Sequence, residues 1–269
     1  MNTTDRGAHA RANDPVLAEM RGGVLWLTIN REQARNALND ALLVRLADCF
    51  KEARRDESLR AIVVTGAGSR AFCAGGDLKS SSATFEFDYS SPSTTYADLM
   101  RIARQTNVPT IARVNGHCLA GGMGLLAMCD MAVAADHATF GLPEVKIGMF
   151  PMQVAALLRR IVPARVFAEL CFSGDSITAA EALECGLVNY VVPAAELDAK
   201  VNSLLDRIVS RSPTAIRRGK YALRAIEDMT IEQSLAYMET QLGTLSLTKD
   251  AAEGIASFNE KRTPNWTGR

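Results

Sequence analysis

The sequence predicts an α/β protein in which a wound βα core is followed by a mostly helical C-terminal region. Residues 60–66, RAIVVTG, form a nearly continuous apolar run, as a parallel strand covered on both faces requires. This run follows a strand-like segment and a helical stripe, which is the order of a crossover unit. From Pro151 onward the pattern is mostly helical, interrupted by a strand-like run at 187–192.

The elements follow from local patterns, taken in chain order. Residues 22–30, GGVLWLTIN, predict a strand because glycine bounds a run rich in β-branched and aromatic side chains. Residues 36–54 predict a helix, since apolar side chains recur on one face. Residues 79–95 are rich in serine and threonine without a sustained period, which predicts a loop. Beyond it we expect a helix to about Gln105, a strand in PTIARVNG, a helix in AGGMGLLAMCD, a strand in MAVAAD and amphipathic helices over 194–258.

A chain of 269 residues fits one large α/β domain, or one domain with a small helical appendage. The sequence contains no internal repeat and no linker that clearly separates two domains. We expect residues 1–15 to be a flexible N-terminus and residues 16–195 to form the core with the active site. Residues 196–269 then form a C-terminal helical region.

Charge and cysteine content exclude several function classes. The 30 basic and 30 acidic side chains cancel, which argues against a nucleic acid or a membrane surface as the main partner. The first residues lack the apolar core of a secretion signal, and no apolar run is long enough to span a bilayer. The six cysteines form no CxxC pair, and no cluster has the spacing of metal ligands. We therefore expect a cytoplasmic protein without a metal site.

One glycine-rich segment matches a dinucleotide fingerprint by spacing. Gly66, Gly68 and Ala71 follow a predicted strand and satisfy the pattern GxGxxA. That motif must open a helix whose N-terminus meets the pyrophosphate. Here the chain continues as FCAGGDLKSSS, which is a poor helix, so a plain loop is the better interpretation and a nicotinamide-dependent oxidoreductase the weaker one.

Two further glycine-rich stretches, AFCAGGDL and NGHCLAGGMG, each follow a predicted strand. Glycine lets the backbone approach a ligand and leaves its N–H groups accessible. If Gly121 and Gly122 open a helix, their amides lack intrahelical acceptors and carry the positive end of the helix dipole. One amide from each stretch could hold a single carbonyl oxygen and stabilise an oxyanion. Tight packing of two loops against a sheet is the alternative.

Three motifs together resemble the enoyl-CoA hydratase/isomerase family, the crotonases. They are FCAGGDL, NGHCLAGGMGLLAMCD and ATFGLPEVKIGMFP, and the likeness extends from about Val24 to FNEKRTPNW near the C-terminus. The resemblance implies a crotonase-type spiral core of ββα repeats and a C-terminal helical region that mediates trimerisation. It implies an acyl-CoA substrate that carries its own coenzyme A, with no separate cofactor. The expected assembly is a homotrimer or a hexamer of two stacked trimers.

The resemblance also assigns roles to single residues. In the family, the oxyanion hole is formed by two peptide N–H groups at the positions of Gly76 and Gly121, and the acid/base glutamate lies at the position of Glu144. Hydratases of the family place a second glutamate three residues after the oxyanion glycine, where this chain has Gly124. A lone carboxylate can still move a proton between C4 and C2, which favours double-bond isomerisation. Hydration of a 2-enoyl-CoA and a catalytically silent acyl-CoA-binding relative are the alternatives.

Glu144 has a plainer interpretation as a surface or capping glutamate behind Pro143. A general base in an apolar pocket should have a raised pKa, because the pocket disfavours its charge. The expected pocket residues are Phe140, Leu142, Val145, Ile147, Met149 and Phe150.

Coenzyme A needs cationic contacts for its phosphates and an apolar surface for its adenine. By resemblance, Arg35 and Ala37 supply contacts from the stretch after the first strand. Phe258 and Lys261 supply contacts from the C-terminal stretch of a neighbouring subunit. Each of the four is otherwise an ordinary surface charge or an ordinary apolar side chain.

Overall fold

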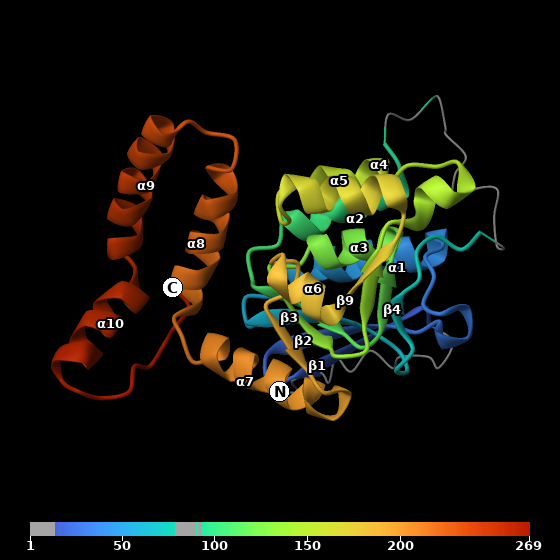
Figure 1. Ribbon diagram of the computed structural model, residues 1–269. Helices are drawn as coiled ribbons and strands as arrows, with labels where there is room; N and C mark the ends of the chain where they lie inside the picture. The colour runs from blue at the N-terminus through green and yellow to red at the C-terminus, as the bar shows by residue number, and fades with distance from the viewer. Residues whose placement is uncertain (1–13, 79–89, 91–92) are drawn as a thin grey trace.

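The central sheet has six strands, and every neighbouring pair except β1–β2 is parallel. The computed structural model describes residues 14–78, 90 and 93–269 (Figure 1). In spatial order the strands are β1 (Val16–Arg21), β2 (Val24–Ile29), β3 (Ala61–Gly66), β5 (Thr110–Val114), β7 (Met131–Ala135) and β10 (Tyr190–Val192). The predicted strand at 22–30 is β2 with the turn before it, whereas β1 is an additional strand that the pattern did not indicate.

A second, smaller sheet has the order β4 (Ala71–Cys73), β6 (His117–Leu119), β8 (Thr139–Gly141) and β9 (Ser176–Thr178). Strands β3, β5 and β7 of the central sheet are each followed along the chain by one strand of the smaller sheet and then by a helical segment. This order confirms the predicted core of ββα repeats. The helical segments are α2 (Thr95–Arg104), α3 (Gly121–Ala127) and the 3-10 helix η3 (Pro143–Ile147).

Alternate residues of β3 pack into two different hydrophobic layers. Ile62 and Val64 join the larger core with helix α1 (Asp40–Ala53), whereas Ala61 and Val63 face α7 (Leu197–Val209). Since successive side chains of a strand point to opposite faces, a strand buried on both sides reads as a continuous apolar run. The run RAIVVTG is therefore explained by cover on both faces of the sheet.

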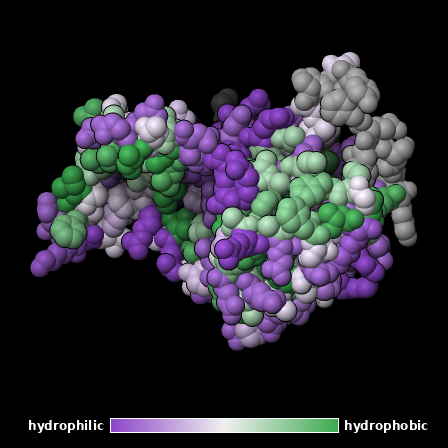
Figure 2. All heavy atoms as spheres, turned by 45° about the horizontal axis from the view of Figure 1, so that its top comes forward, coloured by the Kyte–Doolittle hydropathy of each residue, from purple (hydrophilic) through white to green (hydrophobic). Residues whose placement is uncertain are grey.

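The C-terminal helices extend away from the core at the left of Figure 1, and the first of them bonds to the core through Lys220. They follow α4 (Met152–Leu158), α5 (Ala164–Ser173), α6 (Ala179–Glu184), the 3-10 helix η4 (Ala194–Glu196) and α7. Their bounds are α8 (Pro213–Ala225), α9 (Ile231–Ser246) and α10 (Lys249–Asn259). Helix α9 buries none of its residues in the protomer. Figure 2 shows hydrophobic side chains gathered along these helices, and the strongly exposed ones include Leu223, Ile231, Leu242, Leu247, Ile255 and Phe258.

The dinucleotide pattern does not open a helix. Gly66 ends β3, and after a short loop the chain enters strand β4. A Cβ atom added to Gly66 would lie 2.6 Å from Nδ2 of Asn36, so tight packing accounts for this glycine. The loop interpretation of the segment is therefore correct.

The described residues also show the state of the cysteines, the character of the helices and the grouping of side chains that could bind a metal. All six cysteines are free thiols. Within residues 14–78, 90 and 93–269, no helix is long and apolar enough to cross a membrane. In the same part of the chain, no group of three histidine, cysteine or acidic side chains is arranged to hold a metal ion. The predicted flexible N-terminus and the predicted loop at 79–95 lie mostly outside the described residues.

Candidate functional site

The loop after β4 is fixed by pairing with the residue Leu38. The amide of Leu38 donates to the carbonyl of Gly75 at 2.7 Å, and the amide of Asp77 donates to the carbonyl of Leu38 at 2.8 Å. This parallel bridge uses the carbonyl of Gly75 and the amide of Asp77, which flank Gly76. In such a bridge the N–H of the residue between them points away from the partner strand, so the N–H of Gly76 points away from Leu38. It has no hydrogen-bond acceptor in the described part of the chain. The loop is braced by an ion pair of 2.8 Å between Asp77 and Arg31.

The second candidate amide belongs to Gly121, the first residue of α3. The residue before it, Ala120, has a φ of 49° and donates its own N–H to the carbonyl of Gly141 at 2.9 Å. A positive φ is uncommon for alanine and is held only when the surroundings fix it. The N–H of Gly121 has no acceptor among the residues described, as expected at a helix start without a side-chain cap.

The two loops meet at these glycines. A Cβ atom added to Gly75, which has a φ of 97°, would lie 3.5 Å from the nitrogen of Gly121. Gly76 and Gly121 therefore lie on neighbouring segments, and the amide of each has no acceptor in the described part of the chain. Two such amides are the components from which an oxyanion hole is built. The neighbouring Gly122 has a different role, because a Cβ atom there would overlap the backbone carbonyl of Cys73. The glycine at 122 is required for packing against β4.

Glu144 lies in η3, directly after β8. Its Oε2 atom is buried and has no hydrogen-bond partner among the described residues. Burial raises the pKa of this carboxyl above its ordinary value, although a backbone hydrogen bond opposes the shift. A buried carboxylate oxygen without a partner is costly, so it calls for a reason such as catalysis. A fully solvated Glu144 does not fit this burial.

The expected apolar surroundings of Glu144 are present only in part. Phe140 and Leu142 are fully buried, whereas Ile147 and Met149 are exposed by 58% and 43%. Ile147 is the last residue of η3 and Met149 follows the turn at Gly148, and in the protomer both side chains face outward. The expectation that they enclose Glu144 is wrong for this protomer.

One residue at the site was not indicated by any motif. The hydroxyl of Tyr96, near the start of α2, donates a hydrogen bond to the carbonyl of Gly121. A Cβ atom added to Gly124 would overlap that same hydroxyl. Sequence patterns did not indicate Tyr96, because it belongs to no motif. It lies in an amphipathic helix, directly after a segment that shows no hydrophobic periodicity.

The four residues expected to contact coenzyme A fall into two groups. Arg35 is exposed, and its carbonyl accepts from the amide of Ala74 at 3.1 Å, next to the Gly76 loop. Ala37 is buried, with 8% exposure, and lies beside the bridging residue Leu38. Phe258 is 82% exposed in α10, and the exposed Lys261 follows that helix, which lies apart from the core in Figure 1. The protomer therefore does not bring the two groups together.

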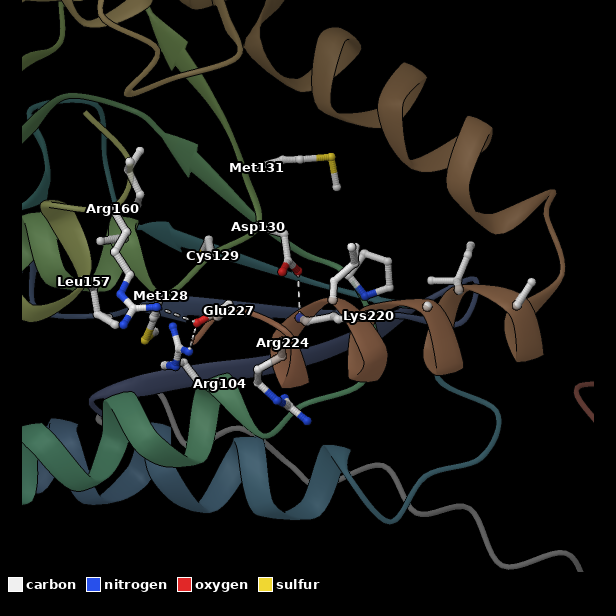
Figure 3. Close-up of a pocket in the computed structure, with 17 residues that line it drawn as sticks. Arg104, Met128, Cys129, Asp130, Met131, Leu157, Arg160, Lys220, Arg224 and Glu227 are labelled. Atoms are coloured by element: carbon white, nitrogen blue, oxygen red, sulfur yellow. Dashed lines mark hydrogen bonds and ion pairs between the residues drawn. The ribbon is translucent and has the colours of Figure 1, made fainter. Parts of the chain in front are cut away.

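A cavity of about 920 Å³ lies elsewhere, between the core and α8 (Figure 3). Two ion pairs lie along it: Lys220 lies 2.7 Å from Asp130, and Arg160 lies 3.1 Å from Glu227. Neither Glu144 nor the two candidate amides line it. We interpret this cavity as a junction between the core and the C-terminal helices.

Comparisons with known proteins give consistent matches to one family. A family model described as enoyl-CoA hydratase/isomerase matches residues 19–269. The 2,3-dehydroadipyl-CoA hydratase of Escherichia coli K12 is 39% identical over 91% of this chain and 96% of its own. Carnitinyl-CoA dehydratase of Proteus mirabilis is 35% identical over 93% of this chain and 97% of its own. A crystal structure of enoyl-CoA hydratase from Mycobacterium smegmatis superposes with a TM-score of 0.88, at 35% identity, over 94% of this chain and 98% of that one.

Proposed function

The chain belongs to the enoyl-CoA hydratase/isomerase family, and we propose that it shifts the double bond of an enoyl-CoA by moving one proton along the acyl chain. The thioester oxygen binds between the N–H groups of Gly76 and Gly121, and Glu144 carries the proton. The observation that supports this most directly is the buried, unpartnered Oε2 of Glu144. The substrate brings its own coenzyme A, so no further cofactor takes part.

The reaction balances with a single carboxylate. Glu144 takes a proton from C2 of a 3-enoyl thioester, and the electron pair moves onto the thioester oxygen to give a dienolate. The protonated carboxyl then returns the proton at C4, which leaves a 2-enoyl thioester. The two amides stabilise the negative oxygen, and one such donor contributes on the order of 3 kcal/mol to transition-state binding. A raised pKa suits Glu144 to both steps, because it must accept and release the same proton.

Hydration of a 2-enoyl-CoA to a 3-hydroxyacyl-CoA is the second candidate, favoured by the names of the relatives. The similar proteins from Escherichia coli and Proteus mirabilis are called a hydratase and a dehydratase. The residue at position 124 argues against hydration, because hydratases of the family have their second glutamate there and this chain has Gly124. Hydration by this site would require Glu144 to activate the water and also to protonate C2.

The exposed apolar side chains of the C-terminal helices support assembly. Leu247 is 86% exposed and Ile255 is 66% exposed, although both are large and apolar. A contiguous apolar surface of this kind is typical of an interface between protein chains. We expect a homotrimer or a pair of trimers, in which Phe258 and Lys261 approach the coenzyme A of a neighbouring subunit.

Product analysis of three thioester classes tests the function. The protein is incubated with saturated, 2-enoyl and 3-enoyl thioesters of short and medium chain length, and the products are separated by chromatography with mass detection. Conversion of a 3-enoyl to a 2-enoyl thioester is the expected result. A 3-hydroxy product would place hydration first. Binding of all three without turnover would contradict both candidates and identify a silent acyl-CoA-binding relative.

A further inference from the structure

Gly124 has no room for a side chain. A Cβ atom added there would overlap the hydroxyl oxygen of Tyr96 and come within 2.5 Å of Cε of Met100. Both obstructing side chains belong to α2, whereas Gly124 lies in α3. The glycine is thus not simply a missing carboxylate, because the space that its side chain would need is already filled by a phenol.

Both the hydroxyl of Tyr96 and the start of the helix that carries it are held in place by hydrogen bonds. Its hydroxyl donates to the carbonyl of Gly121, and the start of its helix is capped by Thr94, whose Oγ1 accepts from the amide of Ala97 at 3.3 Å. Gln153 donates a further hydrogen bond of 2.6 Å to the same Oγ1 atom. Moving the ring out of the way of a larger residue at 124 would break the bond to Gly121 or shift the capped helix end.

The phenol cannot replace the chemistry of a second carboxylate. Tyrosine has one O–H donor, and Tyr96 commits it to Gly121. Burial is the largest cause of a pKa well above the usual value for Tyr96, and nearby Cys73, Cys118 and Glu144 raise it further. The hydroxyl therefore stays protonated and does not act as a base toward water.

We propose that Tyr96 is a positioning and specificity-determining residue that occupies the place of a second acid/base group and thereby limits the site to one carboxylate. The inference rests on the proposed function, since it concerns the same site. In this arrangement Tyr96 has two effects. It excludes a carboxylate and its bound water from the side of the acyl chain that faces position 124, and it anchors the first turn of α3, which carries the amide of Gly121.

Four variants test this together with the parent protein: Tyr96→Phe, Tyr96→Ala, Gly124→Glu and the double variant Tyr96→Ala/Gly124→Glu. Thermal unfolding is measured for each, and each is given 2-enoyl and 3-enoyl thioesters for product analysis. Gly124→Glu should lower the Tm by several degrees or fail to accumulate as folded protein, because the glutamate meets the phenol. Adding Tyr96→Ala should restore most of the loss, since contacting residues couple.

The products show whether Tyr96 excludes a second acid/base group or only stabilises the fold. The double variant should form 3-hydroxyacyl-CoA from the 2-enoyl thioester at least about tenfold faster than Tyr96→Ala alone, since a second acid/base group typically contributes more than this. Tyr96→Phe keeps the ring and should keep the product of the parent. A double variant with the same products as Tyr96→Ala, or independent effects on Tm, would overturn the inference.

The parent protein separates this inference from the proposed function. A parent that forms 3-hydroxyacyl-CoA overturns the inference, because Tyr96 then does not exclude hydration. A parent that turns over neither thioester contradicts the proposed function alone. In that case the coupling in Tm and a gain of hydration by the double variant still decide the role of Tyr96.

Discussion

Tyr96 donates its hydroxyl proton to the carbonyl of Gly121, while the amide of the same glycine has no acceptor in the described part of the chain. The backbone carbonyl and the backbone amide of Gly121 thus have different roles. The carbonyl is tied to a neighbouring helix, which fixes the first turn of α3. The amide is left for a ligand, and it lies beside the loop that carries Gly76.

Tyr96→Phe should therefore lower stability modestly and activity by severalfold. The substitution removes one partly buried hydrogen bond, and a bond of this kind contributes about 1 kcal/mol. Less constraint on the first turn of α3 should reduce kcat more than it changes KM, because the Gly121 amide binds the enolate more tightly than the substrate. Urea unfolding and steady-state kinetics measure the two effects. An unchanged kcat would show that the bond does not position the amide.

Glu144→Gln should abolish most of the turnover and leave the affinity for acyl-CoA largely intact. An amide cannot accept the C2 proton, and a positioned general base typically contributes a factor of about 10² to 10⁴. Glu184→Gln is the matched control, since Glu184 is exposed on α6. Rates are measured with the thioester that the parent converts fastest. Equal turnover by Glu144→Gln and the control would exclude Glu144 as the proton carrier.

The pH dependence of stability has a defined sign at Glu144. Burial raises its pKa in the folded state above the ordinary 4.5, so the folded protein holds this proton more tightly than the unfolded chain. Stability from this group is present at low pH and is lost as the pH rises through the raised pKa. Glu144→Gln should hence unfold at a higher temperature than the parent at pH 7, with the difference disappearing near pH 4. A constant difference across this range would contradict the shift.

The order of elements in the core could be predicted from the sequence because a strand buried on both faces gives a continuous apolar run, which is easily recognised. The run RAIVVTG is buried on both sides and contains no polar alternation, as β3 confirms. Strand β1, with the sequence VLAEMR, escapes the pattern because it is an edge strand with three exposed residues at its end. Its pairing depends on the turn at Gly22 and Gly23, both with positive φ.

The candidate site could be predicted only as far as its motifs extend. Glu144 and the glycine loops were identified from short contiguous stretches, and the buried Oε2 of Glu144 has no partner among the described residues. The reason for Gly124 could not be found in this way, because Tyr96 reaches it from another helix. Likewise, the motif does not show that Gly122 packs on Cys73, whereas the amide of its neighbour Gly121 is unbonded.

That distinction predicts unequal effects of alanine at the two positions. At Gly122 a Cβ atom meets backbone of Cys73, which cannot move aside, so Gly122→Ala should destabilise by about 1–3 kcal/mol. At Gly121 the nearest obstacle is Cδ1 of Leu38, at 2.8 Å, which is the end of a flexible side chain. Gly121→Ala should thus cost less stability but more activity. Gly219→Ala is the control, since nothing lies within 4 Å of its added Cβ.

Leu247→Asp should weaken the assembly of subunits. Leu247 is the C-cap residue after α9 and is 86% exposed. Loss of its apolar contact together with a buried charge disfavours an interface. The expected result is a smaller species by light scattering and a higher KM for the thioester, if Phe258 and Lys261 reach a neighbouring site. Met20→Asp is the matched control, because Met20 is 50% exposed and belongs to β1, not to the C-terminal helices. An unchanged mass with Leu247→Asp would indicate that the apolar surface of α9 has another partner.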